Sequence, residues 1–138
     1  MEKVICYKVV REQPDGRITS AIISGEFSQI DYSIGKFVRT HPFLGKKGFH
    51  ILVFDSFKNA KRFIGNLSIY KKGDTKIFSC ECVNEVEILP KKCDVYDVNN
   101  VFSSESYLHP DDDVWPLGTR MFKKIKLIEE ILDENTIR

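Results

Sequence analysis

The sequence lacks a long apolar run. None of its hydrophobic stretches approaches the roughly 20 residues that a membrane-spanning helix needs. The chain also opens on a strand-like segment instead of a basic region followed by a short apolar one, so we expect no secretory signal. These features predict a soluble protein without a membrane partner, located in the cytoplasm, or in the host-cell cytoplasm if the protein is viral.

Metal-ligand and disulfide patterns are missing as well. The four cysteines, Cys6, Cys80, Cys82 and Cys93, form no C-x-x-C pair, and the three histidines lie far apart in sequence. Cys80 and Cys82 fall on one face of an apolar strand pattern, where an unpaired cysteine behaves as a small hydrophobic residue. We therefore expect cysteines in the core and no metal site, with a redox role as the alternative.

Phosphate-binding and nucleophile motifs are also absent. The segment Gly-Lys-Lys-Gly at 45–48 lacks the Walker spacing, and the serines of 103–106 lack a G-x-S-x-G setting. The charges show little excess of either sign, with a formal net charge of +1. Residues 1–92 hold sixteen Lys and Arg against ten Asp and Glu, and residues 93–138 hold five against ten. The basic residues are scattered and not clustered with aromatics, so a nucleic-acid partner is not favoured.

What the sequence does contain is a clear strand followed by a helix. Apolar residues occupy both faces of 49–54, as in an internal strand covered on both sides. Asp55 and Ser56 can cap a helix, and Phe57, Ala60 and Phe63 then recur at three-residue spacing. We expect a helix from about Ser56 that lies on a sheet.

The other elements are arranged around this unit. We expect strands at 3–11, 17–24, 75–89 and 118–129, a loop at 41–48, and an irregular stretch with one or two short strands at 25–40. In the strand 75–89, Glu81, Glu85 and Glu87 should face outward, with a bulge near Asn84. The fold class is α+β: a single domain, 1–138, with a twisted, mainly antiparallel sheet of five to six strands, one main helix on a face, and a long irregular acidic loop at 90–116.

Several short segments resemble a family of small uncharacterised domains from phage and bacterial proteins. They are Gly-Lys-Phe at 35–37, Gly-Phe-His at 48–50, Asn-Ala at 59–60, Glu-Cys-Val-Asn-Glu-Val at 81–86 and the Lys-Ile-rich stretch at 124–130. The acidic stretch at 90–116 has no counterpart in the family. The resemblance implies a small α+β domain of the phage or viral type, and it supplies no catalytic residues.

One combination of residues could form an enzymatic site. His50, Tyr32 and Glu81 could line a cleft like that of ADP-ribosyltransferase-like folds, which would bind NAD or another nucleotide. A single histidine at the start of a strand is more often structural, and a strand glutamate is more often solvated or paired with lysine. This nucleotide-handling enzyme is therefore the alternative hypothesis.

The acidic loop provides the preferred hypothesis. Three adjacent aspartates, Asp111, Asp112 and Asp113, precede the only tryptophan, Trp115. Adjacent aspartates of this kind usually form a solvated turn and not a cation site, whereas a tryptophan there can pin the loop to the core or anchor a partner. We expect a recognition protein without catalysis or cofactor, whose acidic, aromatic-bearing loop binds a basic partner protein.

Overall fold

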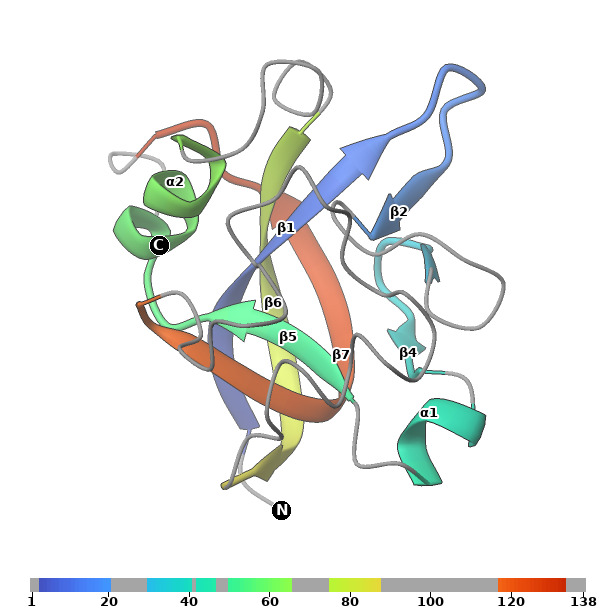
Figure 1. Ribbon diagram of the computed structural model, residues 1–138. Helices are drawn as coiled ribbons and strands as arrows, with labels where there is room; N and C mark the ends of the chain where they lie inside the picture. Colours follow the sequence, from blue (N-terminus) through green and yellow to red (C-terminus); the bar gives the residue numbers. More distant parts are fainter. Residues whose placement is uncertain are drawn as a thin grey trace, which may run out of the picture.

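The computed structural model describes residues 3–20, 30–40, 42–46, 50–65, 75–87 and 117–133. Within these ranges the chain forms seven strands and two helices (Figure 1). In chain order they are β1 (Lys3–Glu12), β2 (Ile18–Ser20), β3 (Asp31–Tyr32), β4 (Phe37–Val38), α1 (Pro42–Lys46), β5 (Ile51–Phe54), α2 (Phe57–Gly65), β6 (Thr75–Val86) and β7 (Thr119–Glu130).

The α+β class and the antiparallel sheet are confirmed, because every strand pairing is antiparallel. The expected count of five to six strands is too low. Strands β3 and β4, of two residues each, are the short strands expected within 25–40, and with both of them present the sheet has seven strands. The loop expected at 41–48 is also incorrect in part, because Pro42–Lys46 forms the short helix α1.

The four main strands close into a ring. One edge of β1 pairs with β6 along nearly its whole length, and β6 pairs with β7 in turn. The other edge of β7 pairs with β5, and β5 returns to β1 through the single pair Tyr7 and Phe54. Short strands extend the ring: β2 pairs with β1, β3 pairs with β2, and β4 pairs with β7 (Figure 1). The sheet is therefore a small barrel with an inside and an outside.

Both sides of the barrel wall are apolar where they are covered. The interior holds a buried cluster that includes Cys6, Val10, Ile51, Val53, Phe78, Cys80, Cys82, Phe122, Ile125 and Leu127. On part of the outside, α2 covers the wall with its buried stripe of Phe57, Ala60 and Phe63. The ring of Phe63 lies 5.0 Å from that of Phe54, measured between centroids. Strand β5 is therefore internal and covered on both sides, as its sequence predicts.

The predicted start of α2 is confirmed by its cap. Ser56 Oγ accepts a hydrogen bond of 3.1 Å from the backbone N–H of Asn59, which would otherwise lack a partner in the first helical turn. The apolar stripe then faces the barrel and the lysines face away. Local sequence signals therefore fix where this helix begins and which face it buries.

The alternation of β6 changes at Asn84, near where the sequence predicts a bulge. Asn84 has a φ of 62°, in the left-handed region. Before it, Cys82 lies opposite buried Ile125, and after it Glu85 lies opposite buried Phe122. Cross-strand partners share a face of the sheet, so the side chain of Glu85 is on the same face as that of Phe122. Glu85 is nevertheless exposed, as expected of an outward residue. The register of β6 with β7 is continuous across Asn84, and its shift lies between Ser79 and Cys80 instead of at the predicted position.

Candidate functional site

A straight row of side chains crosses four neighbouring strands on the outside of the barrel. Ile5 of β1 lies opposite Glu81 of β6, Glu81 opposite Lys126 of β7, and Lys126 opposite Phe37 of β4. The two ends of the row are apolar and open to solvent, with Ile5 51% and Phe37 40% exposed. Two exposed hydrophobic residues thus flank a charged centre.

The centre of the row is held by two ion pairs. Glu81 Oε1 lies 3.0 Å from Lys3 Nζ, and Glu81 Oε2 lies 3.2 Å from Lys126 Nζ. Hydrogen bonds from Lys3 and then Lys126 hold the pKa of Glu81 below its ordinary value. Glu81 therefore stays ionised near neutral pH and acts as a brace between two lysines. This agrees with the structural interpretation of Glu81 as a carboxylate that is paired with lysine.

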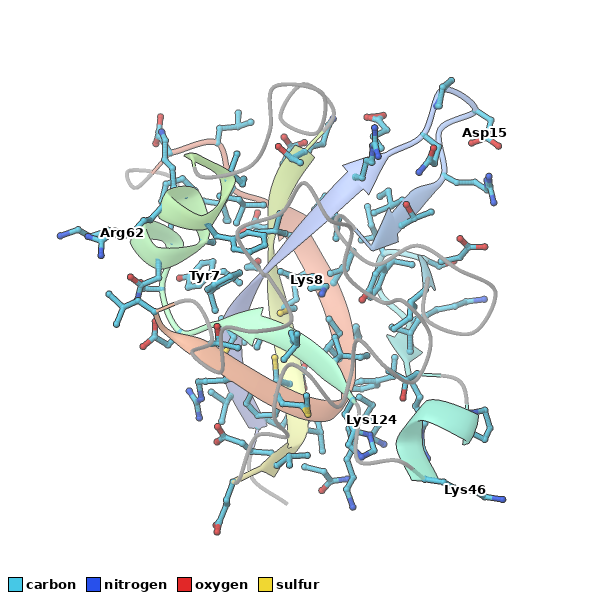
Figure 2. The ribbon with its side chains drawn as sticks, in the orientation of Figure 1. Tyr7, Lys8, Asp15, Lys46, Arg62 and Lys124 are labelled. Atoms are coloured by element: carbon cyan, nitrogen blue, oxygen red, sulfur yellow. The ribbon has the colours of Figure 1, made fainter. Side chains whose placement is uncertain are left out.

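Two lysines also order the ring of Phe37. The ammonium nitrogens of Lys124 and Lys126 lie 5.1 and 5.0 Å from the ring centroid, within the range of a cation–π contact. Lys36, which precedes Phe37, and Arg39, two residues after it, are exposed. Figure 2 shows Lys124 on the opposite side of the view from Arg62 of α2. The surroundings of Phe37 are therefore cationic.

The turn between β3 and β4 adds further apolar surface. The N–H of Gly35 donates a 2.9 Å hydrogen bond to the carbonyl oxygen of Leu127, which fastens this turn to β7. The turn needs glycine there, because Gly35 has a φ of 86°. It carries Ile34, and the neighbouring part of β7 carries Ile128, both of them exposed. We call the whole surface the Phe37 face, and it consists of Lys3, Ile5, Ile34, Phe37, Glu81, Lys124, Lys126 and Ile128.

The three residues of the predicted nucleotide cleft do not share one side of the barrel wall. Tyr32 belongs to the buried interior cluster. Glu81 lies between Cys80 and Cys82 of that cluster, so alternation along the strand puts its side chain on the outside. His50 lies just before β5 and close to Gly45 of α1, whose substitution by alanine would place a Cβ 3.5 Å from His50 Cε1.

The environment of His50 favours the neutral imidazole. Burial lowers its pKa, and the positive charge of Lys123 adds to this effect. Within the described residues, Glu81 forms ion pairs with Lys3 and Lys126. No interaction of the described residues links Glu81 to His50. The predicted pairing of His50 with Glu81 in one cleft thus has no supporting contact in the described part of the chain.

The remaining predicted site residues lie outside the described ranges. These are Trp115 and the three aspartates Asp111, Asp112 and Asp113, and the same holds for Cys93 and for the loop 90–116 that contains them. Their proposed roles stay predictions from the sequence. The three described cysteines, Cys6, Cys80 and Cys82, are buried and free, which confirms that they are core residues.

Sequence reasoning missed a buried lysine inside the barrel. Lys8 lies among the interior strands, and its Nζ donates a 2.8 Å hydrogen bond to the carbonyl oxygen of Leu52 (Figure 2). Burial lowers its pKa to about 8. The position could have been found from alternation, because Lys8 lies between Cys6 and Val10, two residues away from each on the same strand face.

The buried thiols near this lysine are poor nucleophiles. A hydrogen bond with Cys82, followed by burial, raises the pKa of Cys6. The bond with Cys6 lowers the pKa of Cys82, but contact with Cys80 and burial raise it overall. Because the thiolate is the reactive form, Cys6 and Cys82 remain protonated and unreactive at neutral pH. Within the described ranges, no group of three or more His, Cys, Asp or Glu is arranged to hold a metal ion.

The chain matches no protein-family model, no curated protein sequence and no solved structure. In the part of the chain that the structure describes, no helix has the length and apolar content needed to cross a bilayer. The Phe37 face is the candidate functional site of the described residues.

Proposed function

We propose that this protein is a small recognition protein of the phage or viral type that binds a partner protein without catalysis, and that the Phe37 face is its binding surface. The phage or viral part of the proposal comes from the sequence resemblance. The binding surface comes from the residues of β1, β4, β6 and β7.

The observation that carries the proposal is the row that joins Ile5, Glu81, Lys126 and Phe37. An aliphatic and an aromatic side chain are exposed at its two ends, although burial in a core would be more favourable for each. Four of the six large apolar side chains that the described residues expose belong to the Phe37 face. Clustered exposed hydrophobic residues mark protein–protein interaction sites.

The same row is pre-organised for binding. Glu81 holds Lys3 and Lys126 in place, and Lys124 and Lys126 hold the ring of Phe37. Side chains that are already ordered lose less rotamer entropy on association. An aromatic residue that is fixed in this way is a suitable centre for an interface, because such residues contribute much of the binding free energy.

Trp115 and the three aspartates provide a second predicted contact, proposed on sequence alone. The nucleotide-handling alternative, with His50 and Glu81, receives no comparable support. The carboxylate of Glu81 is already bound by two lysines. The Phe37 face is therefore the first candidate for the binding surface, and the acidic loop is the second.

Site-specific photo-crosslinking tests this proposal. A benzophenone amino acid replaces Lys36, which is exposed beside Phe37, and in a matched control it replaces Lys58, which is exposed on α2. We expect a discrete crosslinked protein band in host-type cells from position 36 and none from position 58. Equal bands from both positions, or no band from position 36, would contradict the proposal.

A further inference from the structure

We infer that the partner presents an extended acidic segment to the Phe37 face, with carboxylates on alternate residues followed by an apolar residue. This inference rests on the proposed function, which it narrows to one class of partner. It is carried by the order of charges and hydrophobic residues along β7.

The cations on this face outnumber the carboxylates available to them. Lys124 contacts the ring of Phe37, and no carboxylate of the described ranges lies within ion-pair distance of it. The carboxylate of Glu81 is shared between Lys3 and Lys126, and Glu129 is exposed further along β7. Lys36 and Arg39 add two exposed positive charges next to Phe37. Charge complementarity therefore favours an acidic partner.

The spacing of the side chains defines the shape of that partner. Lys124 and Lys126 lie two residues apart on one strand, so their Cα atoms are separated by about 6.6 Å. Alternate residues of an extended peptide have the same spacing, and a peptide running along β7 can place one carboxylate against each lysine. The next outward residue of β7 is Ile128, which is exposed. The complementary segment thus has five positions, with an acidic residue at the first and third, an apolar residue at the fifth, and any residue at the second and fourth.

The apolar residues of this face favour a protein segment over a nucleic acid. Single-stranded nucleic acids bind to platforms with several aromatic side chains, on which successive bases stack. Phe37 is the only aromatic residue of the Phe37 face, whereas Ile5, Ile34 and Ile128 are aliphatic. Aliphatic side chains bury best against apolar side chains of a protein.

The test is a titration of the isotope-labelled protein, followed by two-dimensional NMR, with three probes. The first is a 12-residue peptide that contains Glu-Ser-Glu-Ser-Leu, the second carries Gln in place of Glu, and the third is a 12-nucleotide oligo-dT. We expect the Glu peptide to shift the amide signals of β4 and β7 and to bind at least about fivefold more tightly than the Gln peptide. Raising the salt concentration should weaken this binding.

Variants locate the binding and separate the two claims. Lys124→Gln should weaken binding of the Glu peptide about fivefold, and the matched control Lys58→Gln on α2 should leave it unchanged. If both peptides bind with equal affinity, or if neither binds, the inference that the partner presents an acidic segment is wrong. The crosslink from position 36 then decides whether the proposed function still stands. Tighter binding of oligo-dT than of the Glu peptide would replace the protein partner with a nucleic acid. Loss of the crosslink would instead overturn the proposed function itself.

Discussion

Arg120 of β7 forms a bidentate ion pair with Glu85 of β6 at one end of the barrel. Its Nε donates a 2.8 Å hydrogen bond to Glu85 Oε2, and Nη2 donates to Oε1 of the same carboxylate. Nη1 lies 3.7 Å from the thiol of Cys6, and the guanidinium lies 5.2 Å from the centroid of the Phe122 ring. The ion pair therefore lies next to the buried thiol of Cys6, close to Asn84, where the side-chain alternation of β6 changes.

This pair should stabilise the fold at neutral pH and lose its effect in acid. The hydrogen bond from Arg120 lowers the pKa of Glu85 below its unfolded value. Its stabilisation is therefore complete above the unfolded pKa of about 4.3 and disappears as the pH falls through the lower folded pKa. Both side chains are about one-third exposed, so we expect Glu85→Gln to cost only about 1 kcal/mol at pH 7.

Urea denaturation at pH 7 and pH 3 measures this effect. The difference in unfolding free energy between the wild type and Glu85→Gln should shrink in acid. Glu87→Gln, which changes an exposed carboxylate just after β6, serves as the control and should change stability little at either pH. A difference that is equally large at both pH values would show that the loss is not electrostatic.

Lys8 should make the fold more stable in mild alkali. Its folded pKa of about 8 lies below the ordinary value of 10.5, so the folded state disfavours the charged amine. Burial of the charged amine lowers the unfolding free energy below pH 8. As the pH rises from 8 toward 10.5, the unfolding free energy should increase by at most about 3 kcal/mol.

The matched variant is Lys8→Met, which removes the titrating group but keeps a long apolar side chain. Between pH 7.5 and pH 10, chemical denaturation should show wild-type stability rising relative to that of the variant. Alkaline ionisation of cysteine and tyrosine in the unfolded chain is common to both proteins and cancels in the comparison. A constant difference over this pH range would mean that Lys8 stays charged or reaches water.

A side chain at Gly118 should destabilise the fold more than backbone strain alone. Gly118 has a φ of 82°, and an added Cβ would overlap Asn59 Nδ2 and Asp55 Oδ1, which are joined by a 2.7 Å hydrogen bond. The carbonyl oxygen of Gly118 also accepts a 2.9 Å hydrogen bond from the N–H of Asp55. We expect Gly118→Ala to reduce the unfolding free energy by about 2 kcal/mol or more.

Gly16→Ala is the control for backbone strain alone. Gly16 has a φ of 90°, but an added Cβ would have no neighbour within 4 Å. Its substitution should therefore cost about 1 kcal/mol. Equal losses for the two variants in thermal or urea unfolding would show that the contact with Asp55 and Asn59 contributes nothing.

Much of the fold could be predicted because the long elements carry strong local signals. The strand β1, the cap at Ser56 and the stripe of α2 agree with the alternation and helical spacing of their side chains. Closure of the barrel could not be predicted, because it depends on the distant pair of Tyr7 and Phe54. Such long-range pairing leaves no pattern within a short window of sequence.

The candidate site was harder to predict for a related reason. Phe37 becomes an exposed neighbour of Lys124 and Lys126 only because the two-residue strand β4 pairs with β7. The basic residues that look scattered along the sequence are brought together by this pairing. Glu81 was recognised as a candidate, but its two lysine partners are 78 and 45 residues away in sequence and could not be assigned from the pattern.

The recognition hypothesis also predicts an absence of nucleotide binding. A ligand at about 100 times its dissociation constant raises the unfolding free energy by roughly 2.7 kcal/mol, which a thermal-shift assay detects. We expect no shift with NAD, ADP-ribose or common nucleotides. A clear shift with one of them that is lost in His50→Ala or Glu81→Gln, but kept in Glu87→Gln, would favour the nucleotide cleft.

The most direct test of the recognition hypothesis is a quantitative affinity purification from host-type cells with three forms of the protein. They are the wild type, Phe37→Ser on the Phe37 face, and Leu132→Ser, which changes an exposed leucine outside that face. All three should be folded at the temperature of the assay, which a thermal unfolding curve checks, because Phe37 and Leu132 are both exposed and neither belongs to the buried core. The hypothesis predicts that a co-purifying protein is depleted at least about fivefold by Phe37→Ser and retained by Leu132→Ser. Equal recovery with all three forms would contradict it.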